Sequence, residues 1–116
     1  MGIVHHSNYV RYLELARVHW LDEHHRSYRE VMETGRYFAT THVEVDYRAP
    51  LRFDDIVEVG VWLEWVRGAS LRMAYALARD ESLVATAATE HAMVDDGGRV
   101  RRIPPADRAT LRALAG

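Results

Sequence analysis

Residues 8–24 read NYVRYLELARVHWLDEH, and this stretch carries the clearest structural signal in the chain. Its apolar side chains recur at intervals of three and four residues, which places them on one face of a helix. The apolar positions are Tyr9, Tyr12, Leu13, Ala16, Trp20 and Leu21. Charged residues fall between them on other faces. The stretch therefore predicts an amphipathic helix over residues 8–24.

A second, shorter helix is predicted immediately afterwards. Ser27 and Glu30 have the spacing of a capping box, and Val31 with Met32 supplies a short apolar face. Gly35 can adopt the left-handed conformation that commonly ends a helix.

Downstream of Gly35 the hydrophobic spacing changes to two, which is the period of a β-strand. Three segments show this alternation, at 43–47, 57–63 and 71–77, and residues 83–95 are apolar or small at nearly every position. The last pattern is typical of a central strand covered on both faces. Pro50 is expected to end the first of these strands. Turns are expected at Arg67-Gly68-Ala69, Asp80-Glu81-Ser82 and Asp95-Asp96-Gly97-Gly98.

These elements predict an α+β fold in which one helix lies on a curved antiparallel sheet of four long strands. Pro104-Pro105 breaks regular structure, so residues 106–114 are expected to form a final helical turn or a frayed tail. We interpret residues 1–116 as a single domain, since the length suits one domain and favours oligomerisation.

Composition excludes several classes of function. Seventeen acidic residues balance fifteen basic ones, all of them arginine, so the net charge of −2 does not attract nucleic acid or anionic lipid. There is no cysteine, which excludes disulfides, thiol nucleophiles and thiolate metal sites. No apolar stretch reaches the length of a membrane span, and no signal peptide is evident, so we expect a cytoplasmic protein without membrane contact.

Three parts of the sequence together resemble a known family. The first part is residues 2–9, GIVHHSNY, together with Arg11-Tyr12-Leu13-Glu14 and Ala16-Arg17. The second is residues 45–52, VDYRAPLR, followed by Asp54-Asp55. The third is residues 93–97, MVDDG, and the segment that continues to Pro104. The chain resembles the 4-hydroxybenzoyl-CoA thioesterase family of hotdog-fold proteins. The first segment is the most specific, because a glycine, a histidine and an asparagine-tyrosine pair lie in register with a helix.

The resemblance implies a hotdog fold, in which five antiparallel strands wrap a long helix and two copies pair with their active sites at the interface. It leaves homodimer and homotetramer open. It also implies a first strand before Gly2 and a water-directing aspartate two positions before Met1. The first strand is thus missing from this chain, and we expect both features to be encoded in frame upstream of Met1.

The implied activity is hydrolysis of a small or medium acyl or aroyl thioester to the free acid and coenzyme A. The resemblance places the main-chain amide of His6 against the thioester carbonyl, where it stabilises the developing oxyanion. Asn8 could orient water or substrate by its side-chain amide, although asparagine is also a preferred N-cap. Gly2, Val4 and Tyr9 are expected to bind substrate, with a core role as the alternative for Tyr9.

Glu14 is the one carboxylate inside the first segment, and it is the candidate catalytic acid if the upstream aspartate is absent. An ion pair with Arg11 or Arg17 is the structural alternative.

Arg67, Arg101 and Arg102 could bind the phosphates of coenzyme A, because guanidinium recognises phosphate in a bidentate manner. A solvated basic edge explains them equally well. Zinc is disfavoured, since the seven histidines include no His-Glu-x-x-His pair. We therefore expect no metal and no cofactor beyond the coenzyme A of the substrate.

Two other functions remain open at this point. One is a non-catalytic protein of the same fold that binds acyl thioesters or a partner. The other is a hotdog dehydratase or hydratase that uses His6 and Glu14 as acid and base. The sequence specifies no acyl group, because pocket depth depends on residues outside these motifs.

Overall fold

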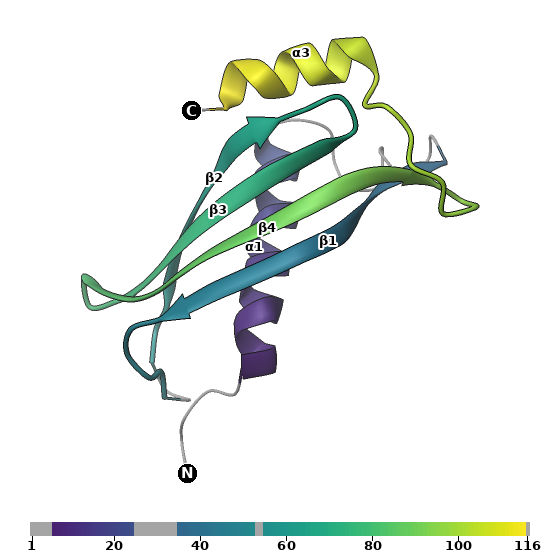
Figure 1. Ribbon diagram of the computed structural model, residues 1–116. Helices are drawn as coiled ribbons and strands as arrows, with labels where there is room; N and C mark the ends of the chain where they lie inside the picture. The colour runs from purple at the N-terminus through teal and green to yellow at the C-terminus, as the bar shows by residue number, and fades with distance from the viewer. Residues whose placement is uncertain (1–5, 25–34, 53–54, 116) are drawn as a thin grey trace.

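The structure is a computed structural model that describes residues 6–24, 35–52 and 55–115. Helix α1 (His6–His24) is followed by strands β1 (Arg36–Tyr47), β2 (Glu58–Val66), β3 (Ser70–Arg79) and β4 (Ser82–Asp95) and then by helix α3 (Pro105–Leu114). The four strands form one sheet in the order β1-β4-β3-β2, and every neighbouring pair is antiparallel (Figure 1). The α+β class predicted from the hydrophobic periods is confirmed.

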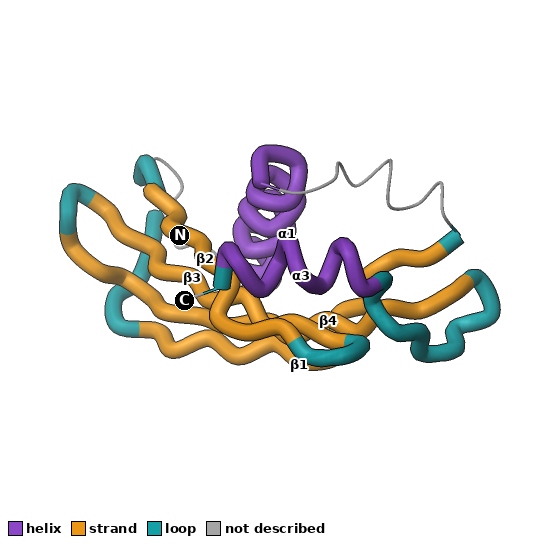
Figure 2. Tube along the Cα trace, turned by 90° about the horizontal axis from the view of Figure 1, so that it is seen from above, coloured by secondary structure: helices purple, strands orange, loops and turns teal. Residues whose placement is uncertain are grey.

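The sheet is curved, and α1 lies on its concave side (Figure 2). Inward positions on β3 alternate with outward ones as expected: Leu71, Met73, Tyr75 and Leu77 are almost fully buried. They pack against Leu13, Trp20 and Leu21 of α1 in one apolar cluster. The apolar face of α1 and the inward-facing side chains of β3 therefore bury each other.

Strand β4 occupies the centre of the sheet between β1 and β3, as its continuous apolar pattern indicates. Strand β1 differs from its prediction. It begins at Arg36, before the alternating segment, because residues 36–40 pair with residues 91–95 of β4. A bulge between Thr40 and His42 separates this early part from the alternating part.

The predicted turns are confirmed at Arg67-Gly68-Ala69 and at residues 80–81. In the second of these, Arg79 pairs with Ser82, so the loop between β3 and β4 contains only Asp80 and Glu81. The open question at the C-terminus is also answered. Residues 105–114 form helix α3, with Pro105 in its first turn and Leu111 fully buried.

Two expectations fall outside the residues that the structure describes. The short helix predicted after Ser27 lies within residues 25–34, and the strand expected before Gly2 would precede the chain. Among the described residues, no helix combines the length and apolarity needed to cross a bilayer, and no three His, Cys, Asp or Glu side chains gather as potential metal ligands.

Candidate functional site

Helix α1 begins at His6, so its first amide groups lie inside the GIVHHSNY segment. The first four N–H groups of a helix have no partner within the helix, and the dipole makes this end electropositive. The first turn carries no acidic side chain. This end of α1 therefore offers backbone donors to a polarised carbonyl oxygen.

The observed start of α1 corrects one interpretation. Asn8 lies two residues inside the helix, so it is not the N-cap. Tyr9 follows in the same turn, and the structure describes only the backbone of both. Gly2 and Val4 lie outside the described residues, so their predicted roles in substrate binding stay predictions.

Glu14 is exposed on α1, eight residues after His6. At a rise of about 1.5 Å per residue, roughly 12 Å along the axis separates it from the amide of His6. The expected ion pair with Arg11 or Arg17 is not formed in the described part of the chain. Its catalytic role stays a prediction, but this distance is too long for one carbonyl to contact both groups in the same chain.

Arg17 is the unexpected residue of α1. Its side chain points into the protein and is only 8% exposed. Its Nε and Nη1 atoms have no hydrogen-bond partner among the described residues. A buried, unpaired guanidinium is costly, because desolvation of the charge is not offset by a counter-ion.

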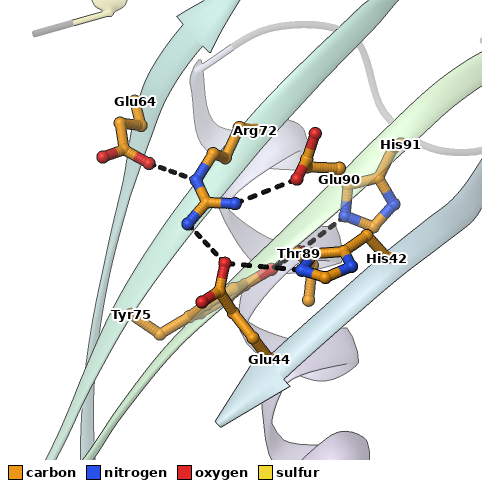
Figure 3. Close-up of polar contacts among 8 residues, drawn as sticks. All are labelled: His42, Glu44, Glu64, Arg72, Tyr75, Thr89, Glu90 and His91. Atoms are coloured by element: carbon orange, nitrogen blue, oxygen red, sulfur yellow. Dashed lines mark hydrogen bonds and ion pairs between the residues drawn. The ribbon is translucent and has the colours of Figure 1, made fainter. Parts of the chain in front are cut away.

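Beneath Arg17 a chain of polar side chains crosses the inner face of the sheet. The hydroxyl groups of Tyr75 and Thr89 are 2.6 Å apart, and Thr89 Oγ1 is 2.7 Å from Nε2 of His91. Nδ1 of His91 is 3.2 Å from the hydroxyl of Thr40 on β1. Figure 3 shows Tyr75, Thr89 and His91 side by side. Each of these four side chains therefore has a polar partner.

Burial determines the protonation states of this network. Burial, reinforced by the positive charge of Arg17, lowers the pKa of His91 to about 3. Burial also raises the pKa of Tyr75 above its usual value. Both groups are neutral at physiological pH, so neither neutralises Arg17.

A small cavity of about 10 Å³ joins Arg17 to this network. It is large enough for about one water molecule. Its lining comes from α1 and from three strands: Leu13, Glu14, Arg17, Thr40, Val43, Tyr75, Thr89 and His91. Because Val43 lies on the edge strand and is 39% exposed, the cavity lies beside the open edge of the sheet.

The sequence interpretation missed this network, although a signal for it was present. Thr89 and His91 are polar residues at inward positions of a strand that is otherwise apolar. A polar residue at a core position needs a buried partner. That pattern pointed to a buried polar cluster, while the identity of its members depends on the register of three strands.

Of the predicted phosphate-binding arginines, Arg67 lies in the turn between β2 and β3, and Arg101 and Arg102 lie in the segment between β4 and α3. Both segments lie away from the start of α1 (Figure 1). The guanidinium of Arg67 stacks 4.1 Å from the ring centroid of Trp65. Nη2 of Arg102 lies against Gly68, where an added β-carbon would approach it to 3.2 Å. The main-chain bond from Ile103 N–H to Gly68 O, at 2.9 Å, holds the two segments together.

Arg101 is less suited to phosphate binding than the other two arginines. Its Nε donates to the carboxylate of Asp95 at 2.8 Å. That hydrogen bond lowers the pKa of Asp95. Arg67 and Arg102 are therefore brought together by the fold, while Arg101 is engaged by the turn that follows β4.

The outer face of the sheet carries a separate charged cluster, which is also shown in Figure 3. Arg72 donates to Glu44, Glu64 and Glu90 at 2.6, 2.5 and 3.0 Å. These bonds, led by the one to Glu44, raise the pKa of Arg72 above its already high value. Since its donors are engaged by carboxylates, this arginine is not a phosphate site.

Comparisons with known proteins identify the relatives of the chain. Residues 1–114 match the family model described as the thioesterase-like superfamily. A putative esterase of Aquifex aeolicus is 35% identical over 96 residues, which cover 83% of this chain and 75% of that protein. The acyl-CoA thioester hydrolase YbgC of Escherichia coli is 37% identical over 70 residues. That alignment covers 60% of this chain and about half, 52%, of the E. coli protein.

A solved structure agrees closely with the fold. The crystal structure of a hypothetical protein from Thermus thermophilus superposes with a TM-score of 0.91 at 36% identity. The match covers 98% of this chain and 88% of the other.

Proposed function

This chain belongs to the thioesterase-like superfamily of hotdog-fold proteins, and we propose that it is a cytoplasmic enzyme that hydrolyses acyl-CoA thioesters. The substrate carries a small or medium acyl or aroyl group, and the products are the free acid and coenzyme A. The observation that carries the proposal is the start of α1 at His6, inside the segment that resembles the family's active-site motif.

The proposed reaction places the thioester carbonyl oxygen against the amide of His6. As water attacks the carbonyl carbon, negative charge develops on that oxygen, and the helix terminus stabilises it. A carboxylate must direct the water, and Glu14 of the same chain is about 12 Å away along the helix axis. We propose the aspartate expected two positions before Met1 for this role.

We further propose that the enzyme is a homodimer whose sites form between subunits. Strand β1 is an edge strand of twelve residues. Inward-facing apolar residues on it, including Val43 and Tyr47, remain partly exposed. An edge of this length is normally covered or paired, because its free N–H and C=O groups recruit another chain. Arg67 and Arg102 are proposed to bind coenzyme A phosphate.

The proposal is tested by two variants at His6. His6→Pro removes the amide donor while proline remains acceptable in the first turn of a helix. We expect it to reduce kcat for acyl-CoA hydrolysis by about 100-fold, the usual loss of one oxyanion donor. His6→Ala keeps the amide and should lose much less. Thiol release measures turnover, and circular dichroism checks folding.

Equal losses in the two variants would show that the imidazole carries the chemistry. Binding of acyl-CoA without thiol release would support the binding protein instead. Reversible hydration of an enoyl thioester would support the hydratase.

A further inference from the structure

Arg17 carries a buried charge with no counter-ion in the described part of the chain. Its side chain is 8% exposed, and Nε and Nη1 have no hydrogen-bond partner among the described residues. Two titratable groups that line the cavity with Arg17, His91 and Tyr75, are neutral at physiological pH, and the third, Glu14, forms no ion pair with it in the described part of the chain. A carboxylate at this position would offset a large cost, because an uncompensated buried charge is strongly destabilising.

The position of the Arg17 cavity suggests where that carboxylate comes from. Its β1 residues are Thr40 and Val43, which lie on either side of the middle of Arg36–Tyr47. If two copies pair along their full β1 strands in antiparallel fashion, the two-fold axis passes through this middle. The Arg17 cavities of both copies then lie next to the axis.

In this arrangement, Glu14 is the candidate for that carboxylate. It lines the same cavity as Val43, so it lies on the side of α1 that faces the open edge. It forms no ion pair in the described part of its own chain. In such a dimer the two α1 helices would run antiparallel, and Glu14 of each copy would be directed towards Arg17 of the other.

We propose that Glu14 of the partner subunit forms the ion pair that Arg17 lacks among the described residues of its own chain, and that two such reciprocal pairs cross the dimer interface. The proposal rests on the dimer of the proposed function but not on catalysis. Each pair neutralises a buried charge only when the subunits associate. In a single subunit the buried charge of Arg17 is therefore not neutralised by this carboxylate.

Mixing two neutral variants tests this arrangement. In the Glu14→Gln homodimer, each Arg17 lacks its carboxylate, and in the Arg17→Met homodimer each Glu14 lacks its guanidinium. A heterodimer of the two retains one complete pair. We therefore expect weaker self-association of each variant alone, by tenfold or more in Kd, and a heterodimer fraction well above the one half given by random exchange. Native mass spectrometry measures both.

Charge-reversal variants provide a second and stronger test of the same ion pairs. Glu14→Arg and Arg17→Glu each place like charges at both pairs of their homodimer, while the mixture restores two opposite pairs. We expect monomers from each variant alone and a heterodimer on mixing. If Arg17→Glu does not fold, the neutral pair still provides the test.

Three results would overturn the proposal. A random mixture of dimers in the neutral arm would mean that Arg17 pairs within its own chain or with another acid. Unchanged self-association of Glu14→Gln would exclude this residue from the interface. A monomeric parent chain at micromolar concentration in sedimentation would remove the dimer, whatever its activity with acyl-CoA.

Discussion

His91 gives the protein a specific acid sensitivity. Burial, with the nearby charge of Arg17, lowers its pKa from 6.5 to about 3. Between these values the unfolded chain binds a proton that the folded chain does not. The free energy of unfolding therefore falls as pH falls from 6.5 towards 3, by up to about 1.4 kcal/mol per pH unit from this group.

Urea denaturation at several pH values measures this slope. We expect His91→Gln to flatten it over that range. The matched control is His42→Gln on the outer face of β1, where the parent side chain is 51% exposed. The interpretation fails if the two variants have the same pH dependence.

Thr89 connects the two ends of the buried network. Its hydroxyl contacts both Tyr75 and His91, so Thr89→Val leaves two buried polar groups without that partner. We expect the free energy of unfolding to fall by about 2 kcal/mol, within the range for an unsatisfied buried group. Thr41→Val is the control, because that hydroxyl is exposed and donates to Glu90 O. Equal losses would contradict a special role for Thr89.

At the scale of secondary structure, the turn between β3 and β4 is strained. Asp80 and Glu81 have φ values of 49° and 66°, which favour glycine or asparagine. Glu81→Gly should therefore raise the free energy of unfolding by about 1 kcal/mol. Glu58→Gly, an exposed position in β2, should lower it, because glycine weakens a strand. Urea midpoints compare the two, and a loss at both sites would contradict the strain.

The same elements show how far sequence reasoning extends. Alternation predicted β3 and its buried face, and a continuous apolar run predicted that β4 is central. The early part of β1 was missed because residues 36–40 contain no clean alternation and become a strand only by pairing with β4. The Arg17 cavity was missed for a related reason, since it joins α1 to three strands whose register no local pattern specifies.

At the scale of the whole molecule, the location of the active site depends on the distance between the start of α1 and the two arginines Arg67 and Arg102. Helix α1 has 19 residues, which corresponds to about 28 Å. Its start lies at one end of the subunit, and the turn between β2 and β3, which holds Arg67 and contacts Arg102, lies at the other (Figure 1). In the proposed dimer, a two-fold axis through the middle of β1 would reverse one subunit against the other. Each helix start would then lie at the same end of the dimer as the partner's arginines.

Subunit mixing distinguishes a shared site from a site within one chain. The His6→Pro chain lacks the amide donor, and an Arg67→Gln/Arg102→Gln chain lacks the phosphate ligands. If each site combines the two ends across the dimer, every heterodimer contains one intact site. After random exchange, half of the dimers are mixed, so roughly one quarter of all sites regain parent activity.

The measurement is kcat/KM for an acyl-CoA thioester before and after mixing. We expect the mixture to exceed the mean of the two separate variants severalfold, because intact sites appear only in heterodimers. Mixing His6→Pro with the Arg48→Gln chain provides the control, since Arg48 is exposed and pairs with Asp46; that mixture should retain the activity of the Arg48→Gln sites. A mixture of the test pair that equals the mean would show that one subunit binds the thioester and the phosphates by itself, with the coenzyme extended along α1.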